Sequence, residues 1–416
     1  MEAIDSLLER KLEALTQPLA VVLPDGHRIG PAEAAVTIRL KHISSLVHIA
    51  AGEIGKVAQD YVEDRLDFDG SVRDLMAIAS QMIESDPTRD DRGTTLNWWR
   101  GIRLNARSRN RHQAHADARQ VQFHYDVSDA FYELWLDPMR LYSCAYFRDG
   151  AMSLAQAQQA KLDHICRKLL LRPGERFLDI GAGWGGLLIW AAEHYGVRAH
   201  GITLSRNQHA HVCRLIEARG LQGRVTIELR DYRELPEGEP YDKIASVGMF
   251  EHVGRAQLPT YFAKIHRLLK PGGLLLNHGI TAGGVRNRQL GAGMGDFIER
   301  YIFPGGELAH VSKVTELMSE AQFEPLDLEN LRPHYGRTLW AWSDALEARL
   351  VPARQVTRES VVRAYRLYLA GSAMSFEQGW MGLFQMLAAR PSGRVADGPM
   401  PGAQSQFPFN RGYMYC

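Results

Sequence analysis

The stretch SVGMFEHVG, residues 246–254, places a carboxylate and an imidazole directly after an apolar run. The run predicts a buried strand that ends at Gly248, and Glu251 and His252 follow within four residues. A carboxylate in such a water-poor place can accept hydrogen bonds or take part in proton transfer. The structural alternative is that Glu251 begins a helix, whose dipole stabilises it. We expect His252 to pack beside the site.

A second candidate is the glycine loop FLDIGAGWGG, residues 177–186, which follows a predicted strand and opens a helix. Gly181 and Gly183 allow a tight turn and a close approach to a ligand, and Asp179 stands at the strand end. The next strand ends in GITLSRNQ and lacks the acid that a dinucleotide-binding fold places there. This disfavours NAD, and the D-x-G-x-G form is typical of S-adenosylmethionine (SAM) methyltransferases. The alternative is a structural glycine turn.

The cysteines argue against a disulfide framework and a metal site. They are scattered without a C-x-x-C pair, at Cys144, Cys166, Cys213 and Cys416. This usage fits a reducing cytoplasm, and we expect no metal ion. No neighbouring sequence feature favours a thiolate at Cys144, so we expect this side chain not to act as a nucleophile.

The candidate residues follow different predicted strands, so the fold must bring the ends of these strands together. From about residue 121 onward, short β-rich runs alternate with helical stretches, which predicts an α/β fold with a Rossmann-like, doubly wound parallel sheet. Ligands of such sheets lie at the carboxyl ends of the strands, where Asp179 and Glu251 are expected. Residues 297–308 are predicted to form a lid or channel wall.

Residues 359–390 are predicted to form C-terminal helices. Their flexible apolar side chains suit an acyl chain or a plain helical core. These side chains are Met374, Phe376, Met381, Phe384 and Met386.

A length of 416 residues predicts two domains. Residues 1–85 are expected to form a smaller α+β domain. It would contain a Pro-Asp-Gly turn between two short strands and further strands within residues 34–42 and 64–70. A helix is expected over residues 71–83. Residues 86–120 are predicted to be a basic linker. Residues 121–416 would then be the catalytic domain with its C-terminal helices.

The linker combines a tryptophan pair, Trp98 and Trp99, with many arginines and one acid in its last stretch. These arginines are Arg100, Arg103, Arg107, Arg109, Arg111 and Arg119. One interpretation is a surface that attracts anionic lipid head groups, with the indole rings at the interface. The other is a solvated linker anchored by its tryptophans.

The bulk composition excludes some classes of protein. The formal net charge is +1, which argues against a nucleic-acid-binding protein. The first 17 residues have helical spacing but carry acids, so they do not read as a signal peptide. No apolar run approaches the roughly 20 residues that cross a bilayer. We therefore expect a cytoplasmic protein that meets lipid only at the membrane surface.

Four separated blocks resemble the cyclopropane fatty acid synthases and their mycolic acid cyclopropane synthase relatives. The blocks are FHYDVSDAFYELWLDPMRLYSCAYF (123–147), LDIGAGWGG together with GITLSRNQ, SVGMFEHVG, and RYIFPGGEL (300–308). The N-terminal unit is similar to the lipid-binding module that precedes the catalytic domain in many bacterial members. Two departures are Ala182, where many members have Cys, and NHGIT, which aligns through His-x-Ile alone.

The resemblance implies a SAM cradle and a bicarbonate site. The implied SAM contacts are Tyr142, Ser143, Asp179, Gly181, Gly183, Trp184, Thr203, Leu204 and Gln208. The implied bicarbonate site is Cys144, Glu251, His278, Ile280 and Tyr335. Glu251 would accept a hydrogen bond from bicarbonate, His278 and Tyr335 would donate, and Cys144 and Ile280 would contribute mainly through backbone groups.

The activity that the resemblance implies is methyl(ene) transfer from SAM to the double bond of an unsaturated phospholipid acyl chain, giving a cyclopropane. The resulting carbocation needs a dry pocket, aromatic rings and a base. Three alternatives stay open: a methylene- or methyl-branched product from the same cation, a methyltransferase for a small soluble acceptor, and a lipid-binding protein without catalysis. The resemblance also implies a homodimer at the inner membrane face.

Overall fold

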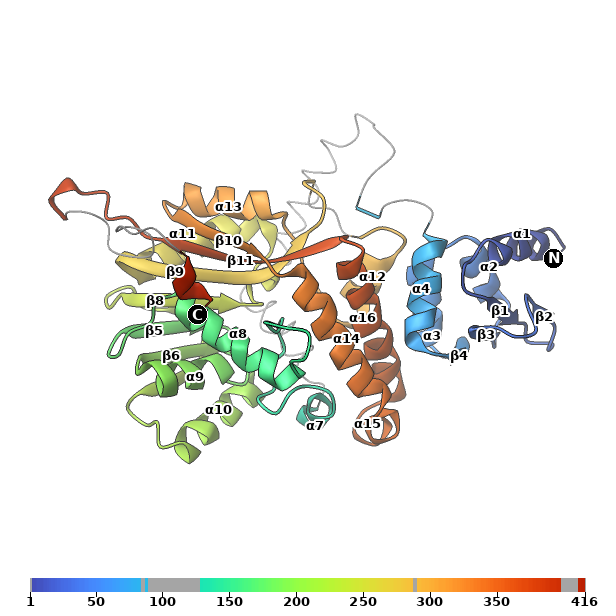
Figure 1. Ribbon diagram of the computed structural model, residues 1–416, viewed down its shortest axis with the longest axis horizontal. Helices are drawn as coiled ribbons and strands as arrows, with labels where there is room; N and C mark the ends of the chain where they lie inside the picture. Colours follow the sequence, from blue (N-terminus) through green and yellow to red (C-terminus); the bar gives the residue numbers. More distant parts are fainter. Residues whose placement is uncertain (1, 84–86, 89–127, 287–289, 398–410, 416) are drawn as a thin grey trace.

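The structure is a computed structural model, and it describes residues 2–83, 87–88, 128–286, 290–397 and 411–415. A four-stranded sheet lies in an amino-terminal unit, and a seven-stranded sheet forms the centre of a larger layered unit (Figure 1). Apart from residues 87–88, the predicted basic linker, with its arginines and its tryptophan pair, lies outside the described residues.

The amino-terminal unit has the strand order β2-β1-β3-β4. Its strands are β1 (Leu19–Val22), β2 (Arg28–Ile29), β3 (Val36–Leu40) and β4 (Leu66–Gly70). Its helices are α1 (Glu2–Glu13), α2 (Ser44–Ala50), α3 (Ile54–Val62) and α4 (Val72–Met82). The predicted turn joins β1 to β2 in antiparallel register, with Val21 opposite Ile29. The Ser71 hydroxyl caps α4 by accepting a hydrogen bond from the Asp74 N–H at 3.0 Å. The sequence analysis assigned no helix to α2 or α3, which are seven and nine residues long.

The larger sheet has the order β10-β11-β9-β8-β5-β6-β7. Its strands are β5 (Arg176–Ile180), β6 (Arg198–Thr203), β7 (Val225–Leu229), β8 (Tyr241–Val247), β9 (Leu269–Ala282), β10 (Glu324–Asn330) and β11 (Met381–Ala389). The pairs β5–β6, β6–β7, β5–β8 and β8–β9 are parallel. The Rossmann-like α/β fold is therefore confirmed, but the sheet is mixed, because β11 runs antiparallel to both β9 and β10.

The prediction of C-terminal helices is right for α16 (Glu359–Glu377) and wrong for the residues after it. Gly379 has φ +75°, a conformation that glycine adopts without strain, and it separates the helix from strand β11. Strand β11 is flanked by a partner on each edge and is mostly buried. A short apolar run without period-2 alternation cannot be told from a buried helix by its periodicity, which is why the prediction failed.

Helices cover both faces of the large sheet (Figure 1). One face carries α8 (Leu154–Lys168), α9 (Gly186–Tyr195) and α10 (Arg206–Ala218), and the other carries α11 (Leu258–Leu268) and α13 (Val311–Glu320). Ser153 and Gln156 start α8 with a capping box. The short 3₁₀ turns of the described residues are η1 (Tyr232–Glu234), η2 (Phe250–His252), η3 (Arg255–Gln257), η4 (Val395–Asp397) and η5 (Gly412–Met414).

A third group of helices lies between the large sheet and the amino-terminal unit (Figure 1). It comprises α7 (Asp129–Glu133), α12 (Met294–Tyr301), α14 (Arg332–Glu347), α15 (Leu350–Val356) and α16. One continuous apolar core joins these helices to the amino-terminal sheet. Two nearly buried arginines of α16 strengthen this junction. Arg363 donates to the carbonyl oxygen of Tyr61 at 2.9 Å, and Arg366 donates to the Tyr61 hydroxyl.

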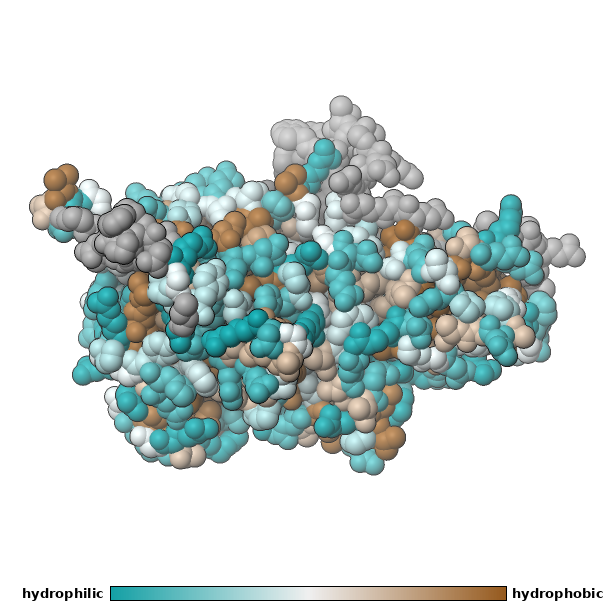
Figure 2. Space-filling view, viewed as in Figure 1, coloured by the Kyte–Doolittle hydropathy of each residue, from teal (hydrophilic) through white to brown (hydrophobic). Residues whose placement is uncertain are grey.

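The molecular surface is mixed in character. On the face shown in Figure 2, small apolar patches lie between larger hydrophilic areas. Among the described helices, none is both long and apolar enough to cross a bilayer.

Candidate active site

Two adjoining pockets open at the carboxyl ends of the central strands. The loop pocket surrounds the glycine loop, and its walls include all nine predicted SAM contacts. The second, called the inner pocket, is walled in part by α14 and α16, and its walls include all five residues predicted for the bicarbonate site. Tyr142, Ser143, Gly248 and His252 line both pockets, so the two cavities meet at these residues.

The glycine loop connects β5 to α9 in the conformation that its sequence requires. Gly181 has φ +80°, and a Cβ atom placed there would lie 3.0 Å from the Met249 side chain. Gly181 and Ala182 both donate their N–H groups to the carbonyl oxygen of Ile202, at 3.0 and 2.9 Å. These bonds fix the loop against the end of β6 and keep the backbone exposed to the pocket.

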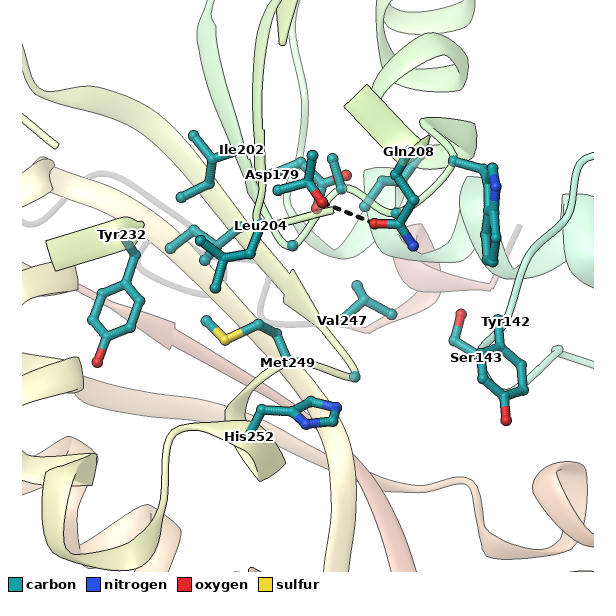
Figure 3. A pocket seen from close by; sticks show the side chains of 18 of the residues that line it. Tyr142, Ser143, Asp179, Ile202, Leu204, Gln208, Tyr232, Val247, Met249 and His252 are labelled. Atoms are coloured by element: carbon teal, nitrogen blue, oxygen red, sulfur yellow. Dashed lines mark hydrogen bonds between the residues drawn. The ribbon is translucent and has the colours of Figure 1, made fainter. Parts of the chain in front are cut away.

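Figure 3 shows the arrangement of the loop pocket, with Tyr142 and Ser143 on one side and Leu204 and Tyr232 on the other. The Thr203 hydroxyl donates to the Gln208 side-chain oxygen at 2.8 Å (Figure 3). The amide nitrogen of Gln208 is buried and has no hydrogen-bond partner among the described residues. This end of the pocket therefore presents a donor that is available to a ligand.

Charged side chains line the loop pocket as well. Asp179 is 2% exposed, and burial raises its pKa to about 7. Lys161, on α8, lines the same pocket, and its ammonium nitrogen lies 2.7 Å from the Ser143 hydroxyl oxygen. Burial lowers the pKa of Lys161 to about 8. Sequence reasoning missed Lys161, because a lysine in an amphipathic helix is usually assigned to the solvated face.

The strand end after β7 supplies further wall residues that sequence reasoning missed. Asp231, Tyr232 and Arg233 line the loop pocket. The Asp231 carboxylate accepts a 2.8 Å hydrogen bond from the Arg233 guanidinium, which holds this corner together. The signal was present, because the polar stretch RDYRE follows a predicted strand whose carboxyl end faces the same edge of the sheet.

Glu251 lies in η2, directly after β8, at the wall of the inner pocket. Its Oε1 atom accepts a 2.7 Å hydrogen bond from the backbone N–H of Ile280, so this N–H is already used by the protein. Its Oε2 atom is buried without a partner among the described residues. Burial raises the Glu251 pKa to about 7, although the bond from Ile280 opposes this shift.

His278 lies on β9, beside Val247 of β8 and Gln385 of β11 in the sheet register. The ring is 1% exposed, and neither ring nitrogen has a hydrogen-bond partner among the described residues. Burial, with positive charges at Lys161 and Lys168, lowers the His278 pKa to about 3. The imidazole is therefore neutral at physiological pH, with one donor and one acceptor to offer.

Cys144 and Tyr335 complete the predicted set. The Cys144 thiol contacts the Ala145 carbonyl oxygen at 3.2 Å, and burial raises its pKa, which disfavours a thiolate. Tyr335, on α14, is 6% exposed, and its ring centroid lies 4.7 Å from that of Phe376. Both residues line the inner pocket.

Aromatic rings form much of the inner pocket wall. They belong to Tyr142, Phe303, Tyr335, Tyr368 and Phe376. The predicted channel wall contributes Ile298, Phe303, Gly306 and Leu308. Of the side chains expected to suit an acyl chain, Phe376 and Met381 line the pocket, whereas Met386 is buried in the core that packs under α11 and α13. The result is a mostly apolar cavity with a few polar groups at one end.

The pockets have the composition that the predicted ligands need. The loop pocket has a buried acid, Asp179, and the free amide donor of Gln208, which suit polar groups of SAM. The inner pocket has a neutral imidazole and an unpartnered carboxylate oxygen, which suit a small hydrogen-bonding oxyanion such as bicarbonate. Cofactor and base would then meet near Ser143 and His252.

Comparison with known proteins gives a consistent result. Residues 112–386 match the family described as "Mycolic acid cyclopropane synthetase". A "Probable fatty acid methyltransferase" of Pseudomonas putida is 41% identical over 409 residues, which cover 97% of this chain and 98% of the relative. "Cyclopropane mycolic acid synthase 1" of Mycobacterium tuberculosis is 40% identical over 280 residues, covering 64% of this chain and 94% of the relative.

The solved structures agree. A crystal structure of mycolic acid cyclopropane synthase CmaA1, complexed with SAH and CTAB, is similar over 65% of this chain and 98% of that chain, with 38% identity and a TM-score of 0.62. The family match begins at residue 112, after the amino-terminal unit, whereas the Pseudomonas putida relative is similar over nearly the whole length of both chains.

Proposed function

Because the chain belongs to the mycolic acid cyclopropane synthetase family, we propose that it transfers a methyl(ene) group from SAM to the double bond of an unsaturated acyl chain in a membrane phospholipid, forming a cyclopropane. It is a SAM-dependent methyltransferase. The observation that supports this choice of substrate and product is that the two pockets adjoin. One is lined by charged and amide groups, the other by aromatic rings, and they share Tyr142, Ser143, Gly248 and His252.

The residues of the loop pocket would hold SAM, which supplies an electrophilic methyl group when it is bound. Gly181 and Gly183 give the backbone room for the ligand, while Asp179 and Gln208 offer polar contacts. Leu204 and Tyr232 line the opposite side of the space (Figure 3). These groups bind and orient, which is their contribution to rate.

The inner pocket would hold the alkene and exclude water from the cation that forms on the acyl chain. The rings of Tyr142, Tyr335 and Phe376 present faces and edges around this space. Aromatic rings stabilise a nearby cation without capturing it, whereas water would add to it. The apolar wall therefore both binds the chain and protects the intermediate.

The polar end of the inner pocket would hold bicarbonate, which supplies a base for the final proton. His278 would donate one hydrogen bond, and Glu251 would accept one through Oε2. Tyr335 would donate another. The Ile280 N–H serves Glu251, so Ile280 acts by positioning the carboxylate.

Membrane association is part of the proposal. We propose that the enzyme works at the membrane surface, that the amino-terminal unit binds lipid, and that two copies form a homodimer. The support for membrane binding is the basic, tryptophan-containing stretch between residues 86 and 120, and the homodimer rests on the family resemblance.

A second candidate product is a methylene- or methyl-branched chain. It is favoured by the name of the Pseudomonas putida relative, a probable fatty acid methyltransferase. All of these products start from the cation that forms when the methyl group adds to the alkene. Loss of a proton from the new methyl group with ring closure gives the cyclopropane, and loss of a chain proton gives a methyl-branched alkene. A hydride shift within the chain followed by loss of a methyl proton gives the methylene chain, whereas a saturated methyl branch would need an external hydride donor.

One experiment tests these proposals. The protein is incubated with SAM and vesicles of a defined monounsaturated phospholipid, and the acyl chains are analysed by mass spectrometry and proton NMR. Upfield cyclopropane protons support cyclopropanation, whereas vinylidene protons or a methyl branch support the second candidate. No gain of a carbon on the chain, together with methylation of soluble amines or hydroxyl compounds, would overturn both.

A further inference from the structure

Lys161 is a buried cation that the proposed chemistry does not yet use. It lies on α8 with 1% exposure, and its ammonium nitrogen lies 2.7 Å from the Ser143 hydroxyl. Among the described residues, no carboxylate forms an ion pair with this nitrogen, and the Ser143 hydroxyl is its one hydrogen-bonding contact. A buried ammonium without a direct ion-pair partner is costly, so the protein must gain something from its presence.

The nearby acids Asp137 and Asp179 act electrostatically on Lys161, but neither forms an ion pair with it. Asp137 directs its carboxylate oxygens to the backbone N–H groups of Met139 and Leu141, at 2.9 and 2.8 Å. Asp179 stands in the wall of the same loop pocket and forms no ion pair with Lys161. The pocket thus holds a cation and an acid that are separated from each other, an arrangement complementary to the two charged groups of an α-amino acid.

We infer that Lys161 binds the α-carboxylate of SAM, with the Ser143 hydroxyl as its neighbour and Asp179 left for the α-ammonium group. This inference rests on the proposed use of SAM and adds a residue to its binding site. The carboxylate supplies the direct ion-pair partner that the buried ammonium lacks, and charge-assisted hydrogen bonds of this kind are the stronger class. The free amide nitrogen of Gln208 offers a further donor in the same pocket.

Two other roles for Lys161 make different predictions. As a structural residue it would only hold Ser143 and the segment before α8, and its loss would weaken every ligand of the pocket equally. As the counter-charge of the bicarbonate site it would leave SAM binding untouched and change the dependence on bicarbonate. A comparison of ligands with and without a carboxylate separates these roles.

The test is isothermal titration calorimetry on the full-length protein with two ligands, S-adenosylhomocysteine and its decarboxylated analogue, which keeps the amine. For Lys161→Met we expect S-adenosylhomocysteine to bind roughly 10- to 100-fold more weakly, and the decarboxylated analogue to bind within about twofold of wild type. Ser143→Ala is the matched variant, since it removes the hydroxyl partner and keeps the ammonium. We expect it to have the smaller effect on S-adenosylhomocysteine.

Equal weakening of both ligands by Lys161→Met would overturn the inference in favour of a structural role. Unchanged binding of both would overturn it too, and a raised KM for bicarbonate would then identify the alternative site. Lys161→Arg keeps the charge and checks for misfolding, since restored preference for the carboxylate ligand shows that the pocket is intact. If wild-type protein binds neither ligand, the proposed use of SAM fails instead, so the two failures are distinguishable.

Discussion

The backbone N–H of Ile280 donates a 2.7 Å hydrogen bond to Oε1 of Glu251. Ile280 lies two residues beyond His278 on β9, so the strand that carries the imidazole also fixes the orientation of the carboxylate. The other oxygen of Glu251 is left without a partner among the described residues. A backbone contact thus aims one acid toward the inner pocket.

The first prediction concerns turnover by Glu251→Gln. The amide keeps the size of the side chain but is a poorer acceptor than a carboxylate, so we expect turnover on monounsaturated phospholipid to fall roughly 100-fold or more. Affinity for S-adenosylhomocysteine should stay within about twofold of wild type by calorimetry, because Glu251 lines only the inner pocket. A variant with full activity would exclude Glu251 from the reaction.

The second prediction concerns stability. Burial raises the Glu251 pKa from 4.5 to about 7, so the folded state binds a proton that the unfolded chain releases above pH 4.5. This group's contribution to stability is present below pH 4.5 and is lost as the pH rises toward 7. At pH 8 the neutral Glu251→Gln variant should therefore be more stable than wild type, by up to about 3 kcal/mol.

Urea unfolding at pH 5 and pH 8 measures this difference. The gain should be much smaller at pH 5, where Glu251 is protonated in the folded state. An equal gain at both pH values would mean that the charge of Glu251 is not its cause.

The third prediction concerns activity as a function of pH. If the ionised form of Glu251 accepts the hydrogen bond from bicarbonate, kcat/KM should rise as the pH passes through about 7. His278, with its pKa at about 3, should add no step in this range. The measurement requires the same bicarbonate concentration at every pH. A step near pH 7 that persists in Glu251→Gln would have to come from another group, with Asp179 the first to examine.

The fourth prediction concerns the contact between α3 and α12. The Gly55 N–H donates to the Ala292 carbonyl oxygen at 2.8 Å, and a Cβ atom on Gly55 would lie 2.1 Å from the Gly293 carbonyl oxygen. Gly55→Ala must therefore push α12 away from α3. Since Ile298 of α12 lines the inner pocket, we expect turnover on lipid to fall several-fold while S-adenosylhomocysteine still binds.

Gly150→Ala is the control for that variant, because a Cβ atom there meets nothing within 4 Å. It should retain wild-type activity. If Gly55→Ala is equally active, α12 tolerates displacement and the pocket does not depend on this contact.

The fifth prediction concerns the basic stretch that precedes the catalytic residues. Replacement of Arg107, Arg109 and Arg111 by Ala should weaken binding to anionic vesicles, and the loss should be greatest at low salt, where screening is weakest. Co-sedimentation with vesicles at two salt concentrations measures it. Unchanged binding would favour the solvated linker.

Much of the site was predictable because its residues stand at strand ends within motifs. The glycine loop, Thr203 and Gln208 follow predicted strands, and the sheet brings them to one edge. Glu251, His278 and Tyr335 come from η2, β9 and α14, and only their resemblance to a family linked them before the structure placed them in one pocket.

What sequence reasoning missed has physical causes. Lys161 is hidden by its helix, since a lysine at helical spacing looks solvated until the neighbouring loop covers it. Strand β11 is buried on both sides and so lacks the alternation that identifies a strand. Ile280 holds Glu251 through its backbone N–H group, and the pattern of side-chain types in a sequence gives no information about such a contact.

The contacts of helix α16 limit how this enzyme can be combined with its relatives in chimeric proteins. One part of the helix carries Arg363 and Arg366, which grip the amino-terminal unit, and a later part supplies Tyr368, Ser372 and Phe376 to the inner pocket. A chimera joined between residues 86 and 127 would combine the amino-terminal unit of a relative with an α16 whose contact surface matches the original amino-terminal unit. We expect such chimeras to fold only when the α16 residues that contact the amino-terminal unit are exchanged together with that unit.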